Sequence, residues 1–343
     1  MNRMIGALVL SFGLVVLLGK WFIPQLIRHK YGQPINELGP KSHQSKQNTP
    51  TMGGLMIAAT LVVVCLLLHP KGWFGTADYM GALLAVSLLS MLVGWLDDYL
   101  KVSKHNSKGL SPKGKIIGQT IIAAGFSCYC YFHPMVGSTI YIPFLNILWD
   151  MGILYIPAMT LLIIFMVNSA NLQDGLDGLL SGVSCVGFSA WGVMALVFLM
   201  LASLLNDPMV NNNYYAIGVF SMAMAGSTMG FLRYNMHPAK VFMGDTGSML
   251  IGGATVGCAL LLRQPFMLLM ISFTMVISSL SVIIQRTYYK LTHGKRIFLN
   301  SPLHHHFEAK HYTETQIGTM YAVCTGILSL IAILSLNGLQ NMH

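Results

Sequence analysis

The stretch Met80–Leu100, MGALLAVSLLSMLVGWLDDYL, carries no charge until Asp97 and Asp98 near its end. An α-helix rises 1.5 Å per residue, so about 20 such residues cross the ~30 Å hydrocarbon core of a bilayer. Apolar runs of similar length recur from one end of the chain to the other, which predicts an all-α polytopic membrane protein with about ten transmembrane helices. The expected helices are 4–27, 52–69, 80–100, 116–133, 153–170, 179–201, 214–232, 247–262, 266–286 and 317–337.

The composition excludes a soluble fold. The 343 residues are 54% hydrophobic and only 9% charged, whereas soluble domains are about one quarter charged. The six cysteines lie inside apolar runs, which indicates packing residues rather than disulfides or a zinc cluster. The first run lacks a small-residue cleavage site after it and is expected to be retained as a helix. No linker or repeat divides the chain, so we expect one domain over 1–343.

Basic residues predict the orientation in the membrane. If successive loops alternate sides, sixteen of the 20 Lys and Arg residues share one side. Positive charge is retained in the cytoplasm, so both termini are expected to face outward. The net charge of +9 then follows from topology and from contacts with anionic lipid or phosphate, without nucleic acid. The sixteen are Arg28, Lys30, Lys41, Lys46, Lys101, Lys104, Lys108, Lys113, Lys115, Arg233, Lys240, Arg286, Lys290, Lys295, Arg296 and Lys310.

The carboxylates divide between the two predicted sides. Asp78, Asp150 and Asp207 lie in short outer connectors, where a solvated loop role is expected. The inner carboxylates all adjoin helix ends, and acidic residues do little to set topology. A polar site at the cytoplasmic interface would explain this grouping. The inner set is Asp97, Asp98, Asp174, Asp177 and Asp245.

The first motif is the Asp97-Asp98 pair, which precedes the lysine-rich stretch 101–115. Adjacent carboxylates at membrane depth are costly unless a metal or another cation neutralises them. We favour a functional pair, because two adjacent acids are a poor anchor. The alternative is a pair of interfacial anchors balanced by Lys101 and Lys104.

The second motif is NSANLQDGLDG, Asn168–Gly178, in which polar residues recur at every third position. Nine residues of a regular helix turn by two and a half turns, so Asn168 and Asp177 cannot share one face. The two glycines indicate that the helix opens near Gly175 and Gly178. The oxygen-bearing side chains and the freed backbone groups would then suit sugar hydroxyls, a nucleotide base or a hard cation. A turn with helix caps would give the same pattern of residues.

The third motif is FMGDTGS, Phe242–Ser248, immediately before an apolar helix. Small residues expose backbone N–H groups at a helix N-terminus, where phosphate binds well, and Asp245 could hold Mg²⁺ there. The alternative is a plain helix cap by Asp245 or Thr246. Phe242 could stack on a base or serve as an interfacial aromatic.

The fourth motif is SPLHHHFE, Ser301–Glu308. Consecutive helical residues diverge by about 100°, so three imidazoles in a helix cannot all reach one metal. We therefore expect one or two histidines to contact phosphate or position a proton rather than bind zinc. A surface cluster without a role is the alternative.

The fifth motif, KQNTPTMGG over Lys46–Gly54, is weak when taken alone. Lys46 could reach a diphosphate as a point charge, and Thr51 could cap the following helix. Together, the five motifs place cations, carboxylates and Gly-rich helix ends on one predicted side of the membrane. This combination favours an interfacial active site for phosphoryl transfer.

Through these residues the chain resembles the bacterial phospho-N-acetylmuramoyl-pentapeptide transferases (translocase I), within the polyprenyl-phosphate N-acetylhexosamine-1-phosphate transferase superfamily. The resemblance rests on TPTMGG at 49–54, the Asp97-Asp98 pair, 168–178, 242–248 and PLHHHFE at 302–308, and extends over essentially the whole chain. The triple histidine favours this family over its sisters. The ten-helix topology of the family, with both termini outside, agrees with the loop count.

The resemblance implies transfer of phospho-MurNAc-pentapeptide from its UDP carrier to undecaprenyl phosphate, which gives lipid I and UMP. It also implies Mg²⁺, a homodimer and the bacterial cytoplasmic membrane, with the active site facing the cytoplasm. It assigns Asp97, Asp98, Asp245, His304 and His305 to the reaction centre, with Asp245 as the metal ligand. Substrate contacts are expected from Lys46, Thr51, Lys101, Lys104, Asn168, Asn171, Asp174, Asp177, Asn235, Phe242, Gly244 and His306.

Two other readings are open at this stage. One is a sister transferase that uses UDP-GlcNAc or UDP-GalNAc, which product analysis with both donors would distinguish. The other is a secondary transporter or flippase, which would place ionisable residues near the membrane midplane. The midplane portions of these helices are nearly free of charge.

Overall fold

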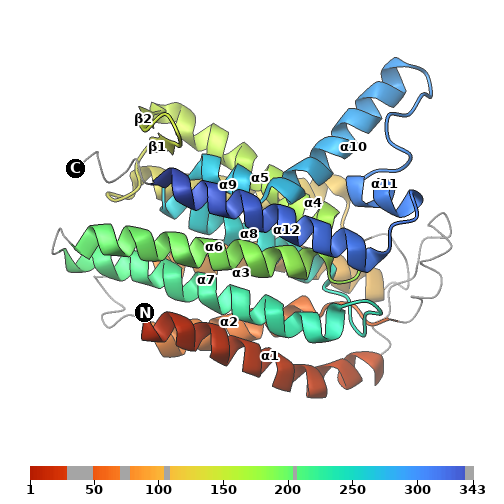
Figure 1. Cartoon of the computed structure of the whole chain (residues 1–343), viewed down its shortest axis with the longest axis horizontal. Helices are drawn as coiled ribbons and strands as arrows, with labels where there is room; N and C mark the ends of the chain where they lie inside the picture. Colours follow the sequence, from red (N-terminus) through yellow and green to blue (C-terminus); the bar gives the residue numbers. More distant parts are fainter. Residues whose placement is uncertain (29–48, 70–77, 104–108, 204–206, 337–343) are drawn as a thin grey trace.

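The computed structural model describes residues 1–28, 49–69, 78–103, 109–203 and 207–336. The chain is a helical bundle with one small hairpin (Figure 1). Its helices are α1 Asn2–Arg28, α2 Gly54–Leu68, α3 Tyr79–Ser103, α4 Pro112–Phe132, α5 Tyr155–Gln173, α6 Leu179–Ala202, α7 Pro208–Asn235, α8 Gly244–Leu261, α9 Pro265–Ile271, α10 Phe273–Leu291, α11 Leu303–Ala309 and α12 Glu314–Leu334. The strands are β1 Thr139–Ile142 and β2 Ile147–Asp150, and the 3₁₀ turn η2 Gly152–Leu154 precedes α5.

The helical membrane fold is confirmed. Within the described residues, six helices are long and apolar enough to cross a membrane, or seven if the bent pair α9 and α10 forms one span. Each of the ten expected segments contains helix. The number of crossings and the outward termini stay predictions.

Helix α8 forms the centre of the bundle. It packs against α2, α3 and α5, and within it only Asp245 is not buried. Small residues such as Gly252, Gly253 and Gly257 let neighbouring helices approach closely, as packing in a bilayer requires. The core of the fold therefore holds the start of α8, and with it Asp245, in a fixed place.

The two ends of the bundle differ. Helix α1 begins and α12 ends at the same end as the β hairpin, whereas α11 lies at the opposite end (Figure 1). Helix α10 leans away from the bundle at the α11 end (Figure 1). We call the end that contains α11 the site end.

Three local features differ from the sequence-based prediction. The expected helix 266–286 is broken at Ser272 into α9 and α10, which meet at an 83° bend. The connector after α4 contains an unexpected antiparallel hairpin, in which Thr139 pairs with Asp150 and Ile142 with Ile147. The seven-residue helix α11 was also not predicted as an element.

The three outer aspartates are exposed, as expected for solvated connector residues, and each also makes local contacts. Asp78 accepts hydrogen bonds from Tyr129 Oη at 2.7 Å and Asn213 Nδ2 at 3.4 Å, and contacts His133 Nε2 at 2.9 Å. Asp207 caps α7 through the backbone N–H of Met209. The Ser138 hydroxyl donates to Asp150 and lowers the pKa of that carboxyl.

Candidate active site

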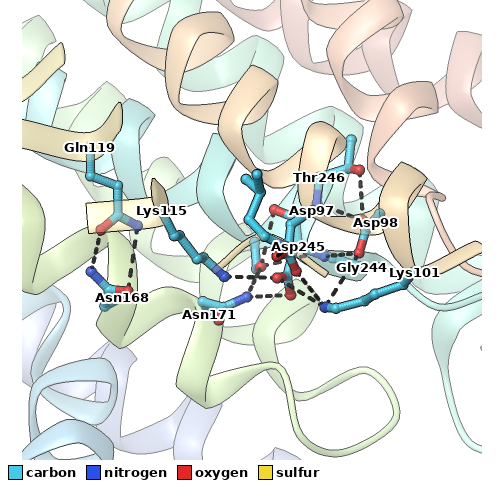
Figure 2. A network of polar contacts seen from close by, with 12 residues as sticks. Asp97, Asp98, Lys101, Lys115, Gln119, Asn168, Asn171, Gly244, Asp245 and Thr246 are labelled. Atoms are coloured by element: carbon cyan, nitrogen blue, oxygen red, sulfur yellow. Dashed lines mark hydrogen bonds and ion pairs between the residues drawn. The ribbon is translucent and has the colours of Figure 1, made fainter. Parts of the chain in front are cut away.

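Three carboxylates from two helices converge at the site end. Asp97 and Asp98 lie near the end of α3, and Asp245 lies in the first turn of α8 (Figure 2). One carboxylate oxygen from each lies within 4.8 Å of the other two. The structure therefore brings together the first and third motifs.

Asp98 caps the start of α8. Its carboxylate accepts hydrogen bonds from the backbone N–H of Asp245 at 3.2 Å and of Thr246 at 2.9 Å, and from Thr246 Oγ1 at 2.7 Å. It is fully buried. The first N–H groups of a helix lack intrahelical partners, and a carboxylate satisfies them and suits the positive end of the helix dipole. The alternative reading, a cap of α8 by its own Asp245 or Thr246, is not what the structure has, because Asp98 of α3 accepts from these N–H groups.

Asp97 faces a different set of partners. Its Oδ1 accepts from the backbone N–H of Leu110 at 2.7 Å, and its Oδ2 lies 2.6 Å from Lys101 Nζ. Lys101 Nζ is also 3.2 Å from Asp245 Oδ2, and Lys115 Nζ is 2.8 Å from the same oxygen. Two ammonium groups thus offset the negative charge of three clustered carboxylates.

Two glycines allow this close approach. A Cβ at Gly94 of α3 would collide with the backbone carbonyl of Asp245. Gly244 has φ +74°, a left-handed conformation that glycine adopts without steric cost, and a Cβ there would lie 2.5 Å from Asp98 Oδ2. A larger residue would therefore clash with the backbone of α8 at position 94, and would be strained by the left-handed φ at position 244.

The second motif orients Asp245 from the end of α5. Asn171 Nδ2 donates to Asp245 Oδ1 at 2.7 Å and to Ser248 Oγ at 2.9 Å. Asn168 lies to one side, where it exchanges hydrogen bonds with Gln119 of α4 at 2.8 and 3.4 Å (Figure 2). The structure therefore joins Asn171 to the carboxylate cluster and engages Asn168 in a bridge between α4 and α5.

The predicted opening of the chain after α5 is confirmed. Helix α5 ends at Gln173, and Gly178 has φ +73° before α6 begins. Asp174 lies in this opening, where burial and the nearby charges of Asp245 and Asp98 raise its pKa to about 8. A carboxyl with this pKa is mostly protonated at pH 7 and can donate a hydrogen bond.

Asp177 ties the opening to two other segments. Its Oδ2 accepts from Ala239 N at 3.0 Å and lies 3.1 Å from His237 Nδ1, and its own N–H donates to Glu314 Oε2 at 2.8 Å. The start of α12 is thereby fixed beside the turn after α7. Asn235 has a structural role as well, because its amide contacts Ser181 Oγ and Val241 O.

The triple histidine lies in the first half of the short helix α11. His304 is buried, and a Cβ at Gly175 would collide with its ring, so α11 packs directly on the opening after α5. His305 Nδ1 lies 2.9 Å from Glu308 Oε2. His306 Nδ1 accepts from Leu299 N at 3.1 Å, and burial together with Lys310 lowers the pKa of this imidazole.

The first basic loop meets the third motif through backbone hydrogen bonds. Phe242 N donates to Pro50 O at 2.8 Å, Gly53 N donates to Phe242 O at 2.9 Å, and Gly54 N donates to Met243 O at 3.0 Å. Thr51 is buried there but does not cap α2, because the cap position is Gly53 and no side chain caps that helix. That expectation was wrong. Lys46 and Lys104 lie outside the described residues.

The chain matches the family model for glycosyl transferase family 4 over residues 80–263, which includes α3 to α8 and thus the carboxylate cluster. Residues 46–57 match signature 1 of the phospho-N-acetylmuramoyl-pentapeptide-transferases. A protein with that name from Bacillus subtilis is 40% identical over 327 residues, which cover 95% of both chains. The chain belongs to the phospho-N-acetylmuramoyl-pentapeptide-transferase family. Relatives with the same name include one from Bacillus pumilus, 40% identical over 95% of both chains, and one from Anoxybacillus flavithermus, 43% identical over 90% of both chains.

Sequence reasoning missed several residues of this family member's site. Lys115 forms one of the shortest contacts with Asp245, but nothing in its sequence context separated it from Lys104, Lys108 and Lys113. Ser248 was quoted only as a member of a small-residue run, and Thr246 only as a possible cap of its own helix, yet Ser248 Oγ accepts from Asn171 and Thr246 Oγ1 donates to Asp98. Helical spacing alone does not reveal such contacts between helices.

Proposed function

We propose that this chain transfers phospho-MurNAc-pentapeptide from UDP-MurNAc-pentapeptide to undecaprenyl phosphate, with lipid I and UMP as products. In this reaction an oxygen of the acceptor phosphate forms a bond to the sugar-linked phosphorus of the donor. The bond from that phosphorus to the UMP oxygen breaks, and UMP leaves with the electron pair. The observation that carries the proposal is the cluster of Asp97, Asp98 and Asp245 with two lysines, in a chain of this family.

The same cluster fits Mg²⁺. Mg²⁺ prefers oxygen ligands and few protein carboxylates. Asp245 has the least buried carboxylate of the three, whereas both oxygens of Asp98 are taken up by the α8 cap. We therefore assign Asp245 as the principal ligand. Mg²⁺ bound there would neutralise charge on the phosphate oxygens.

The lysines supply the remaining positive charge in this proposal. Lys101 and Lys115 contact Asp245, and each has a flexible stem that can move its ammonium group toward an arriving phosphate. Asp97 holds Lys101 in place. The histidines of α11 would contact phosphate from the side of Gly175, where His304 packs on the opening after α5.

The membrane arrangement belongs to the same proposal. We infer ten crossings in the bacterial cytoplasmic membrane, with both termini outside, the site end in the cytoplasm and a homodimer as the working unit. The helices α1 and α12 support this, because their outer ends lie at the same end of the bundle (Figure 1). The cluster lies at helix ends rather than in mid-helix, which argues against a transporter.

The direct test is to incubate the purified protein with radiolabelled UDP-MurNAc-pentapeptide, undecaprenyl phosphate and Mg²⁺. A lipid-soluble labelled product together with released UMP is expected. UDP-GlcNAc and UDP-GalNAc serve as control donors. Transfer from either control donor, without transfer from the pentapeptide donor, would instead indicate a sister transferase.

A further inference from the structure

A cleft of about 280 Å³ lies between α10 and the segment that leads to α11. We call it the α10 cleft. It lies outside the carboxylate cluster, and none of its residues was singled out for a role in the motifs apart from Ser301. Arg286, Tyr289 and Lys290 line it from α10, and Arg296, Asn300 and Ser301 line it from the following segment.

Gln285 builds the wall of this cleft. It is 8% exposed, and its Oε1 accepts from the backbone N–H of Ile297 at 3.1 Å and of Phe298 at 3.0 Å. Its Nε2 donates to Phe298 O at 3.1 Å. One buried amide thus fixes the segment 297–298 against α10, so that Arg296 and Asn300 are presented beside Arg286 and Lys290.

The cleft has three cations without a matching anion. Among the described residues, no carboxylate forms an ion pair with Arg286, Lys290 or Arg296. Arg286 and Lys290 are four residues apart on one helix, where like charges repel. A bound anion would relieve this repulsion. Two guanidinium groups together with the Asn300 and Ser301 side chains suit a carboxylate, which arginine binds through paired hydrogen bonds.

The cleft is within reach of the candidate active site. Ser301 is three residues before His304, so their Cα atoms are at most about 11 Å apart. His304 in turn packs on Gly175 at the end of the second motif. A pentapeptide spans up to roughly 17 Å when extended. A peptide that begins at a sugar held beside the histidines can therefore end in the α10 cleft.

We propose that the α10 cleft binds the free carboxylate of the peptide carried by the donor. This rests on the proposed function, in which the donor is a muramoyl-pentapeptide. A muramoyl group is an acyl group, so it bonds the peptide's amino end and leaves a carboxylate at the other end. The cleft then recognises the length and the charged end of the peptide, while the carboxylate cluster acts on the phosphates.

The test compares two donors with the purified full-length protein: UDP-MurNAc-pentapeptide with its free terminal carboxylate, and the same donor as the terminal carboxamide. The measured quantity is the ratio of the two kcat/KM values. We expect wild type to prefer the free acid by about tenfold, the scale of one lost charge-assisted hydrogen bond. Arg286→Gln should bring the ratio close to one, and Arg296→Gln should lower it too.

Lys295→Gln is the matched control, because Lys295 is an exposed cation of the same segment that does not line the cleft. It should keep the wild-type ratio. Equal kcat/KM for both donors in wild type, or an unchanged ratio in both arginine variants, overturns the inference while transfer itself still supports the proposed function. If transfer fails with both donors in wild type, the proposed function is what fails.

A second arm separates a peptide carboxylate from an acidic lipid headgroup. The wild type and the two arginine variants are assayed in nanodiscs of phosphatidylcholine alone and of phosphatidylcholine with phosphatidylglycerol. The donor ratio should not depend on the lipid. The arginine variants could instead lose activity equally with both donors, and only in nanodiscs that contain phosphatidylglycerol. That result would show that the cleft binds lipid and would overturn the inference.

Discussion

Asp97 and Asp98 are adjacent in sequence but have different surroundings. Successive helical residues point about 100° apart, so the two carboxylates face different partners. Asp98 is taken up by the backbone and hydroxyl donors of α8, and Asp97 by Lys101 and Leu110 N. The acidic pair could be predicted from the sequence as part of a polar site. The different partners of Asp97 and Asp98 could not be predicted, because the partners of Asp98 lie more than 100 residues away along the chain.

The first prediction concerns Asp98 as a structural cap. Asp98→Ala should lower the free energy of unfolding by about 2 kcal/mol, because it leaves two backbone N–H groups and a hydroxyl of α8 without a buried acceptor. Asp207→Ala removes an exposed cap of α7 and should cost about 1 kcal/mol or less. Unfolding of both variants in the same detergent is the measurement. An equal loss in both would show that Asp98 does not support α8 in this way.

The second prediction concerns Asp97 and a base mechanism. A phosphate monoester has a second pKa near 6, so most of the acceptor is already a dianion at pH 7 and a base has little left to remove. We expect Asp97 to position Lys101 and, through it, the phosphates. Asp97→Asn should therefore lose activity, and raising the pH from about 6 to 9.5 should not restore it. Recovery toward wild-type rates at high pH would identify Asp97 as the base.

The third prediction concerns the protonation of Asp174. Burial and nearby carboxylates raise the pKa of Asp174 to about 8, so the group is neutral below this pH and negative above it. Above pH 8 it would add a charge beside Asp245, which disfavours an anionic diphosphate donor. We expect the KM for the donor to rise as the pH passes 8, and Asp174→Asn to remove that rise. If the KM of Asp174→Asn rises above pH 8 as the wild-type KM does, ionisation of Asp174 is not the cause of the rise.

At the scale of elements, hydrophobic run length predicted every long helix but not the interruptions. The stretch PFMLLMISFTMVISSL over 265–280 has no charge and no internal Gly or Pro, so no helix-breaking residue marks the bend at Ser272. The hairpin strands are four residues each, and α11 has seven residues, all shorter than a periodic pattern needs. Contacts with the rest of the bundle determine these features.

The fourth prediction tests how α3 and α8 are held together. Gly94→Ala places a methyl group against the carbonyl of Asp245, so α8 must shift and the carboxylates must separate. We expect at least a tenfold loss of kcat, since small misplacements of reacting groups cost about this much or more. Gly81→Ala on the same helix meets nothing within 4 Å and is the control. Similar activity in the two variants would show that this close approach does not matter for catalysis.

At the scale of the whole molecule, charge and chemistry coincide at one end. Asp97, Asp98, Asp245, Lys101 and Lys115 meet where α3 ends and α8 begins, and the α10 cleft adds three more cations beyond α11. The substrates of the proposed reaction are polyanions, so this distribution would also attract them. Under the proposed orientation, in which positive charge is retained in the cytoplasm, donor and active site would share one compartment.

The last prediction tests this orientation. Single cysteines are introduced by Ser301→Cys at the site end and by Ser203→Cys at the exposed end of α6, in a background whose six native cysteines are replaced by alanine. In intact cells a membrane-impermeant thiol reagent should label the cysteine at 203 and not that at 301, because the proposed orientation places the basic site end inside. The cysteine at 301 should react only after the membrane is permeabilised, and Ser107→Cys, outside the described residues, should behave in the same way. Labelling at 301 from outside, together with protection at 203, would show that the topology is the inverse of the proposed one. The carboxylate cluster would then lie on the outer face, separated from a cytoplasmic UDP-linked donor.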